Sequence, residues 1–333
     1  MRFDLPDTAE QLRSEVARWV DRRVPARGST TAFSPDIWRE FVHIGLLDPS
    51  VDELHRCVGL VEACRHGMCG PVLEARLGVL ADRSGTAERA LADGRVVTSV
   101  APSPAGATLV GWGAVADLVV DQLSGAVVSR EPLPAVRMAQ PMPHGWYQRG
   151  AAVTADPLDR ERWLTGAAII AGLAQGALAL AVEHTANRRQ FGRQLASFQA
   201  VQFPLAECKI LVDGLYLMVL DAADRADCGT QDRGTQERGT QDRGTQDRVT
   251  SALAWLAAVR CAEATTKASH QAFGALGFCL ETGLVQLTWG MAWLRLTSAT
   301  RAARSYLAAH RQRQEPGAAP GCLVLEAFDR NDP

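Results

Sequence analysis

The strongest constraint on the fold of this chain comes from residues 172–202, GLAQGALALAVEHTANRRQFGRQLASFQAVQ. This segment begins as an almost wholly apolar helix pattern, breaks at residues 187–192 and resumes as a second helix pattern. The apolar run around Ile169 is interrupted by Gln175 and Glu183. It therefore predicts a helix of a protein core and not a membrane span.

The pattern divides the chain into four parts. Residues 1–95 predict an N-terminal helical domain, because apolar positions recur at helical spacing between capping residues. Residues 96–158 hold short β-rich runs separated by prolines and predict a small β domain. Residues 159–315 are again helical, and residues 316–333 form a tail. The expected fold is mostly α with a small β module.

Residues 229–248 are four copies of the unit Gly-Thr-Gln-(Asp/Glu)-Arg. Each unit is polar, charge-balanced and free of apolar side chains, so it has no surface whose burial would offset the entropy of ordering. We expect a mobile loop between two helices. A binding tail is the functional alternative, and a repeat expansion in a tolerant loop is the favoured one.

Composition excludes several classes of partner. A net charge of -2 gives no reason to expect nucleic acid or a membrane surface as a partner. The first residues are acidic, polar and helical and do not resemble a signal peptide. We expect a cytoplasmic protein with reduced thiols.

The candidate metal ligands in the sequence are Cys57, Cys64, His66 and Cys69, which lie close together along the chain. Their spacings match no zinc pattern, and the stretch reads as helix. We therefore expect free thiols and no metal.

Two short motifs carry a resemblance to a known family. Arg188-x-x-Phe191-Gly192 and the segment 271–277, QAFGALG, resemble two turns in the C-terminal helical domain of the acyl-CoA dehydrogenases. In that family both turns touch the flavin of a neighbouring subunit. The order helix, β, helix is also that of the family, which implies an N-terminal helical domain, a reduced middle β domain and a C-terminal four-helix bundle.

The resemblance implies FAD as cofactor and assigns a role to each matching residue. Arg188 offers a planar guanidinium suited to phosphate oxygens, although such an arginine can also form a surface salt bridge. Phe191 would pack on the flavin or adenine, or else within the core. Gln199, like Gln202, falls where the next helix meets the nucleotide, or is solvated. At the second turn the resemblance implies that Gln271 and Gly274 contact the cofactor, because glycine lets the backbone approach it closely. Ala275 stands where the family has a second glycine. His270 would bind a phosphate group, or else be an ordinary core or surface histidine.

The catalytic base of the family has no clear counterpart. Counting forward from Gly277 without gaps, Ser298 stands where a family glutamate abstracts the α-proton, and an alcohol is no base at neutral pH. Some members place the glutamate at the start of the first long helix, where Arg162 stands here with Glu161 before it. Glu161 is therefore the one candidate base, with a surface carboxylate in a charge run as the favoured alternative.

The β module also lacks family features. The Thr-Glu-Pro and Gly-Ser strings reduce to Pro102 and Gly106, and no Trp-x-x-Thr strand follows. The short chain and the string Arg65-His66-Gly67 resemble the actinobacterial steroid side-chain branch, in which two unlike subunits form a heterotetramer with fewer flavins than chains.

The resemblance thus implies an oxidoreductase subunit in lipid metabolism that acts in α,β-desaturation of an acyl-CoA, as in steroid degradation. It would complete a flavin site with a second, more complete acyl-CoA dehydrogenase subunit. Two alternatives stay open: a non-catalytic scaffold without flavin, and a self-sufficient homo-oligomeric enzyme with Glu161 as base.

Overall fold

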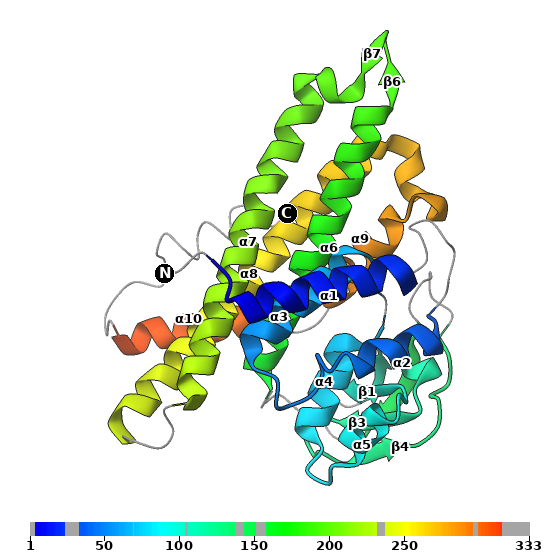
Figure 1. Cartoon of the computed structure of the whole chain (residues 1–333). Coiled ribbons are helices and arrows are strands. Elements are labelled where there is room, and N and C mark those ends of the chain that lie inside the picture. The colour runs from blue at the N-terminus through cyan, green and yellow to red at the C-terminus, as the bar shows by residue number, and fades with distance from the viewer. Residues whose placement is uncertain are drawn as a thin grey trace.

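The structure is a computed structural model that describes residues 4–23, 33–68, 70–103, 106–136, 143–150, 158–231, 237–295 and 299–314. A long helical bundle stands beside a compact module of helices and short strands (Figure 1). The prediction of a mostly α fold with a small β module is confirmed.

The N-terminal helices begin where capping residues stand. Ser34 accepts a hydrogen bond from the Ile37 amide at 3.4 Å, and Asp52 accepts one from the His55 amide at 2.9 Å. The helices are α1 (Asp7–Arg23), α2 (Pro35–His43), α3 (Glu53–Arg65), α4 (Val72–Ala81) and α5 (Thr86–Ala92).

The β module holds two small sheets. In the first, β1 pairs parallel with β3, and β3 pairs antiparallel with β4; in the second, β2 pairs antiparallel with β5. The strands are β1 (Val97–Val100), β2 (Gly106–Val110), β3 (Leu118–Asp121), β4 (Val127–Ser129) and β5 (Gly145–Arg149). All residues of β1 and β3 are buried, because α4 and α5 pack on this sheet.

The bundle is built around α6. Every residue from 161 to 178 except Gln175 is buried, because α3, α7, α8 and α9 all pack on this helix. By length and hydropathy α6 is the one described helix that would span a membrane, but 78% of its most apolar window is buried inside the protein. The bundle elements are α6 (Asp159–Asn187), β6 (Arg189–Gln190), β7 (Arg193–Gln194), α7 (Gln199–Gln231), α8 (Glu237–Phe273), α9 (Leu284–Arg295) and α10 (Ala299–Gln314).

Two glycines set the distance between α6 and α3. A Cβ added at Gly172 would lie 2.3 Å from the Val61 carbonyl oxygen, and one added at Gly176 would lie 2.4 Å from the Arg65 carbonyl oxygen. The two helix backbones are therefore in direct contact, and this contact docks the N-terminal helices on the bundle.

The structure corrects the expectation of a loop over residues 229–248. Helix α7 continues to Gln231 and α8 begins at Glu237, so most of the repeat is helical, and residues 232–236 lie outside the described residues. Two helices are already nucleated on either side, and glutamine, glutamate and arginine propagate a helix well. The end of the repeat is also packed, because Arg248 pairs with Asp159 and lies 4.7 Å from the centre of the Tyr306 ring.

Candidate functional site

The turn between α6 and α7 is a tight hairpin that projects Phe191 into solvent. Strands β6 and β7 pair Arg189 with Gln194 and Gln190 with Arg193, which leaves Phe191 and Gly192 as the two turn residues. Both have positive φ, 53° and 80°, as a two-residue hairpin of this type requires. A left-handed phenylalanine that is 86% exposed has no packing role in its own core.

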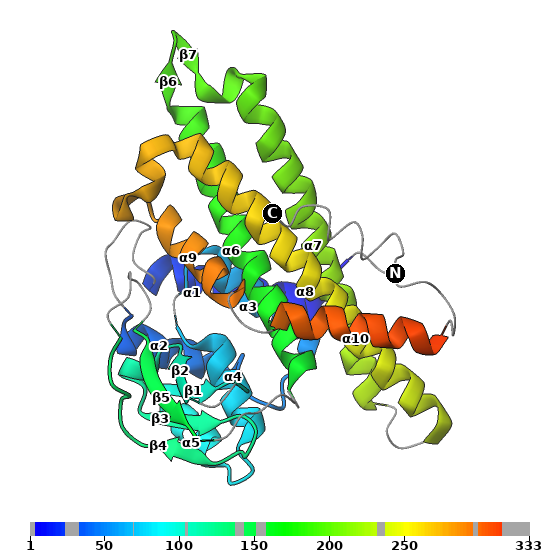
Figure 2. The same cartoon turned by 180° about the vertical axis from the view of Figure 1, so that it is seen from behind.

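The second turn lies at the same end of the bundle. His184, near the end of α6, stacks on Phe273, the last residue of α8, with ring centres 4.2 Å apart. The hairpin and the turn after α8 are therefore neighbours, as the view from behind shows (Figure 2). Gly274 has φ 61°, and both it and Gln271 are exposed. The structure thus places the two motifs that the sequence singled out at the same end of the bundle.

Arg188 carries an available positive charge. Its side chain is exposed, and within the described part of the chain no carboxylate lies within 4 Å of it. Burial lowers the pKa of His184, and the positive charge of Arg188 lowers it further. The His184 imidazole is therefore neutral at physiological pH. An exposed guanidinium that has no carboxylate partner among the described residues suits the oxygens of a phosphate group.

The other residues that the sequence suggests as cofactor contacts differ in whether their polar atoms are free to bind a ligand. Gln199 is exposed at the start of α7, whereas Gln202 donates a hydrogen bond to the Ala196 carbonyl at 2.7 Å. His270 is half-buried and lies 3.0 Å from the Thr288 hydroxyl, and burial lowers its pKa. We assign His270 to the packing between α8 and α9.

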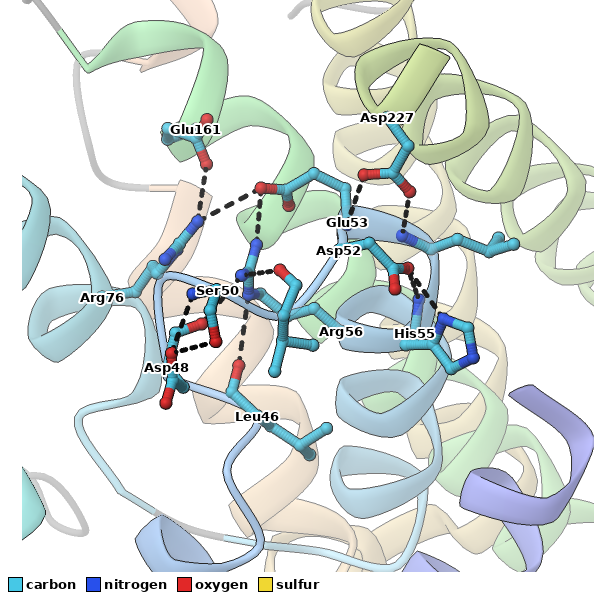
Figure 3. A network of polar contacts seen from close by, with 12 residues as sticks. Leu46, Asp48, Ser50, Asp52, Glu53, His55, Arg56, Arg76, Glu161 and Asp227 are labelled. Carbon is cyan, nitrogen blue, oxygen red and sulfur yellow. Dashed lines mark hydrogen bonds and ion pairs between the residues drawn. The ribbon is translucent and has the colours of Figure 1, made fainter. Parts of the chain in front are cut away.

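Glu161 is not the surface carboxylate that its charge run predicted. It is 9% exposed and pairs with Arg160 and, at 3.6 Å, with Arg76 of α4 (Figure 3). The prediction was wrong because Arg76 comes from a distant part of the chain. Burial lowers the pKa of Arg76, whereas the nearby carboxylates Glu53 and Glu161 raise it. The guanidinium is still a cation at neutral pH.

The same network contains residues that the sequence did not mark. Arg56 is fully buried, pairs with Glu53 at 2.5 Å and donates to three carbonyls of the loop before α3. Asp227 of α7 accepts hydrogen bonds from the Glu53 and Leu54 amides at 2.7 and 2.9 Å, which caps α3 (Figure 3). The network joins α3, α4, α6 and α7, so its role is structural. We refer to Glu53, Arg56, Arg76, Glu161 and Asp227 together as the clamp.

The structure separates Glu161 from the residues that the sequence predicts to bind the cofactor. It lies at the first turn of α6, whereas Arg188 follows the last turn, and a helix of 29 residues is about 44 Å long. One flavin does not span that distance, so these two residues do not serve one site in the same chain. Ser298 lies outside the described residues.

A cavity of about 60 Å³, room for a few water molecules, lies between α3 and α4 on one side and α6 and α9 on the other. Two tryptophans line it, of which Trp112 comes from the β module and Trp293 from α9. Trp112 has a left-handed φ of 62° and is 2% exposed, and Trp293 donates to the Glu74 carboxylate at 3.0 Å. Burial raises the pKa of Glu74. A three-ring flavin does not fit into this cavity.

The cysteine cluster behaves as packed thiols where it is described. Cys57 and Cys64 are buried, and burial raises the pKa of Cys57 well above its usual value. His66 lies 2.9 Å from Glu62, and Cys69 lies outside the described residues. Within the described residues no group of three or more histidine, cysteine, aspartate and glutamate side chains is arranged to hold a metal ion.

Comparison with known proteins identifies the family. Residues 148–310, which include both turns, match the family model "Acyl-CoA dehydrogenase, C-terminal domain". This chain belongs to the acyl-CoA dehydrogenase family. A probable acyl-CoA dehydrogenase, FadE25 of Mycobacterium tuberculosis, is 47% identical over 75 residues, 22% of this chain and 19% of the relative. The chain therefore matches about a fifth of the length of that curated relative.

Solved structures of acyl-CoA dehydrogenases share the fold over nearly the whole chain. The ChsE4-ChsE5 complex from Mycobacterium tuberculosis matches with a TM-score of 0.65 and 20% identity, covering 96% of this chain and 100% of the other. The steroid ACAD pair Tcur3481-Tcur3483 matches with a TM-score of 0.68 and 19% identity, covering 92% and 99%. Similarity at this level of identity supports the fold alone.

Proposed function

We propose that this chain is a subunit of a cytoplasmic, FAD-dependent acyl-CoA dehydrogenase and completes the flavin site of a second, more complete family member. The observation that carries the proposal is the bundle end, where the side chains of Arg188 and Phe191 are exposed. FAD, when bound, supplies a hydride acceptor for the α,β-desaturation of an acyl-CoA.

Each residue at the bundle end has a specific task in this proposal. Arg188 holds the diphosphate by charge-assisted hydrogen bonds, and the hairpin fixes its position. Phe191 covers an aromatic face of the cofactor, and Gln271 donates from its amide. Gly274 lets the backbone approach because its left-handed turn carries no Cβ.

The proposal assigns the proton-abstracting base to the partner subunit. Glu161 is held by two arginines at the far end of α6, and the cavity beside Trp112 is too small for a flavin ring. The substrate class is an acyl-CoA with a bulky acyl group such as a steroid side chain. The proposal takes this substrate class and a hetero-oligomer of two unlike subunits from the descriptions of two proteins that share the fold, the Tcur3481-Tcur3483 steroid ACAD and the ChsE4-ChsE5 complex.

The deciding experiment compares the lone chain with the chain co-expressed beside a full-length family member that retains its glutamate. We expect the lone chain to be colourless and the complex to carry fewer flavins than chains, measured as flavin absorbance per chain. A stoichiometric flavin spectrum from the lone chain would contradict the proposal. A complex without any flavin would favour a scaffold role instead.

In the flavin-loaded complex, Arg188→Ala is expected to weaken FAD binding by about 1.5–3 kcal/mol, because one charge-assisted phosphate contact is lost. The dissociation constant is measured by fluorescence of released FAD. The matched control is Arg22→Ala, which removes another exposed arginine, from α1, and should leave binding unchanged. Equal affinity in the two variants would show that Arg188 faces solvent.

Glu161→Gln is expected to leave turnover per bound flavin unchanged while it lowers the melting temperature of the complex. The substitution removes a buried charge that faces Arg76 and Arg160, so it weakens the clamp and not the chemistry. Turnover of an acyl-CoA with an artificial electron acceptor measures the first effect. Loss of turnover in an assembled, flavin-loaded variant would make this chain catalytic in its own right.

A further inference from the structure

A second arginine of the hairpin lies close to Arg188. Strands β6 and β7 pair Gln190 with Arg193, and the Leu195 amide donates to the Arg188 carbonyl at 2.9 Å. Arg188 is itself extended, with φ −77° and ψ 127°. The two-stranded ladder therefore reaches one residue beyond β6, to Arg188, at the end of the bundle (Figure 1).

The ladder places Arg188 and Arg193 on the same face of the hairpin. Residues that oppose each other across two antiparallel strands project to one side, and side chains alternate between the two sides along each strand. Arg188 and Arg193 therefore share a face, whereas Arg189 projects to the other. Such diagonal neighbours are about 7–8 Å apart, so two arginine side chains reach one ligand.

An aromatic ring holds the Arg193 guanidinium in place. Its Cζ atom lies 3.8 Å from the centre of the Phe198 ring, a cation–π contact. Phe198 is half-buried and packs edge-on against Phe191, with ring centres 6.1 Å apart. A guanidinium that lies on a ring keeps its N–H groups at its own edge, where they can donate to an anion.

The hairpin has no carboxylate that would neutralise these arginines. Residues 184–206 contain three arginines and neither aspartate nor glutamate. Within the part of the chain that the structure describes, Arg193 forms no ion pair with a carboxylate. Two guanidinium groups on one face suit a ligand with two adjacent phosphate groups.

We propose that Arg193 is a second cation that binds the diphosphate of the cofactor beside Arg188, and that Phe198 positions it. The inference rests on the proposed function and adds a contact that the family resemblance did not assign. Arg189, on the opposite face, takes no part. Phe198 acts through the Arg193 guanidinium and is therefore a positioning residue.

The first test measures FAD binding in the flavin-loaded complex. Arg193→Ala should raise the dissociation constant of FAD about tenfold, because a charge-assisted contact is lost. Arg189→Ala is the matched control, since it removes the same charge from the opposite face of the hairpin, and it should change the constant by less than about twofold. Equal losses in the two variants would show that only the overall charge matters and would overturn the proposal.

Coenzyme A also carries a diphosphate, so its dissociation constant is measured beside that of FAD. We expect the same coenzyme A affinity in Arg193→Ala and in the wild type. A loss of coenzyme A binding with unchanged FAD binding would overturn the assignment of Arg193 to the cofactor.

Phe198→Leu tests the positioning role. It keeps an apolar side chain but removes the ring under the guanidinium, so FAD affinity should fall about threefold. Phe198→Tyr keeps the ring and should bind FAD like the wild type. In an Arg193→Ala background, Phe198→Leu should have no further effect. Additive losses would mean that Phe198 is merely structural and would overturn its positioning role.

Inorganic pyrophosphate separates this proposal from the proposed function, because the lone chain presents the hairpin without a partner. Calorimetric titration at low ionic strength should show weaker pyrophosphate binding in Arg188→Ala and Arg193→Ala but not in Arg189→Ala. That pattern would support the two-arginine site even if no flavin-bearing complex forms. A wild type that does not bind pyrophosphate, or equal effects in the three variants, would each overturn it.

Discussion

Gly172→Ala is expected to destabilise the chain by about 2–3 kcal/mol, a loss larger than the gain of up to about 1 kcal/mol that alanine brings to a helix. The added Cβ would lie 2.3 Å from the Val61 carbonyl oxygen and 3.0 Å from the Arg65 amide nitrogen. These are backbone atoms, so no side chain can rotate away, and α3 and α6 must separate. Thermal unfolding followed by circular dichroism measures the effect.

The control is the same substitution in another long helix. Gly214→Ala adds a Cβ that meets nothing within 4 Å of its own chain, so stability should equal or exceed that of the wild type. If Gly172→Ala were as stable as Gly214→Ala, the close contact between α3 and α6 would not exist as described.

Arg56→Met is expected to cost about 3–5 kcal/mol, because it leaves three carbonyls without their donor and removes one of the two arginines that pair with Glu53, the other being Arg76 at 3.1 Å. Arg56 is fully buried, pairs with Glu53 and donates to the carbonyls of Leu46, Asp48 and Val51. The loop between α2 and α3 depends on these contacts. Limited proteolysis should therefore cut this loop in the variant before it cuts the bundle.

Arg39→Met removes an arginine whose ion pair with Asp36, at 2.9 Å, is exposed on α2. Exposed pairs contribute about 0–1 kcal/mol, so this control should unfold almost like the wild type. Similar losses in the two variants would mean that Arg56 is solvated and that the clamp is weak.

The two turns of the candidate site were predictable from the sequence because each is encoded locally. The polar break at residues 187–192 contains the glycine that a two-residue hairpin needs, and its motif is contiguous. The turn at Gly274 is likewise specified by neighbours in the sequence. What the sequence could not predict is that His184 stacks on Phe273, since that contact joins two helices separated by α7.

The repeat and Glu161 show the opposite case. The repeat has no apolar residue, and composition alone predicted a loop, but the helices on either side extend into it. The charge run around Glu161 predicted exposure, yet Arg76 of α4 covers this carboxylate.

By itself, the sequence determined the order of helices and strands, the core position of α6 and the two turns at the bundle end. These features follow from periodicity, capping and turn residues, which act over a few positions. Only the tertiary structure decided which charges are buried, how close α3 approaches α6 and which apolar side chains of α7 remain exposed to solvent. Burial and ion pairing depend on partners that are distant along the chain, and only packing of the folded chain brings those partners into contact.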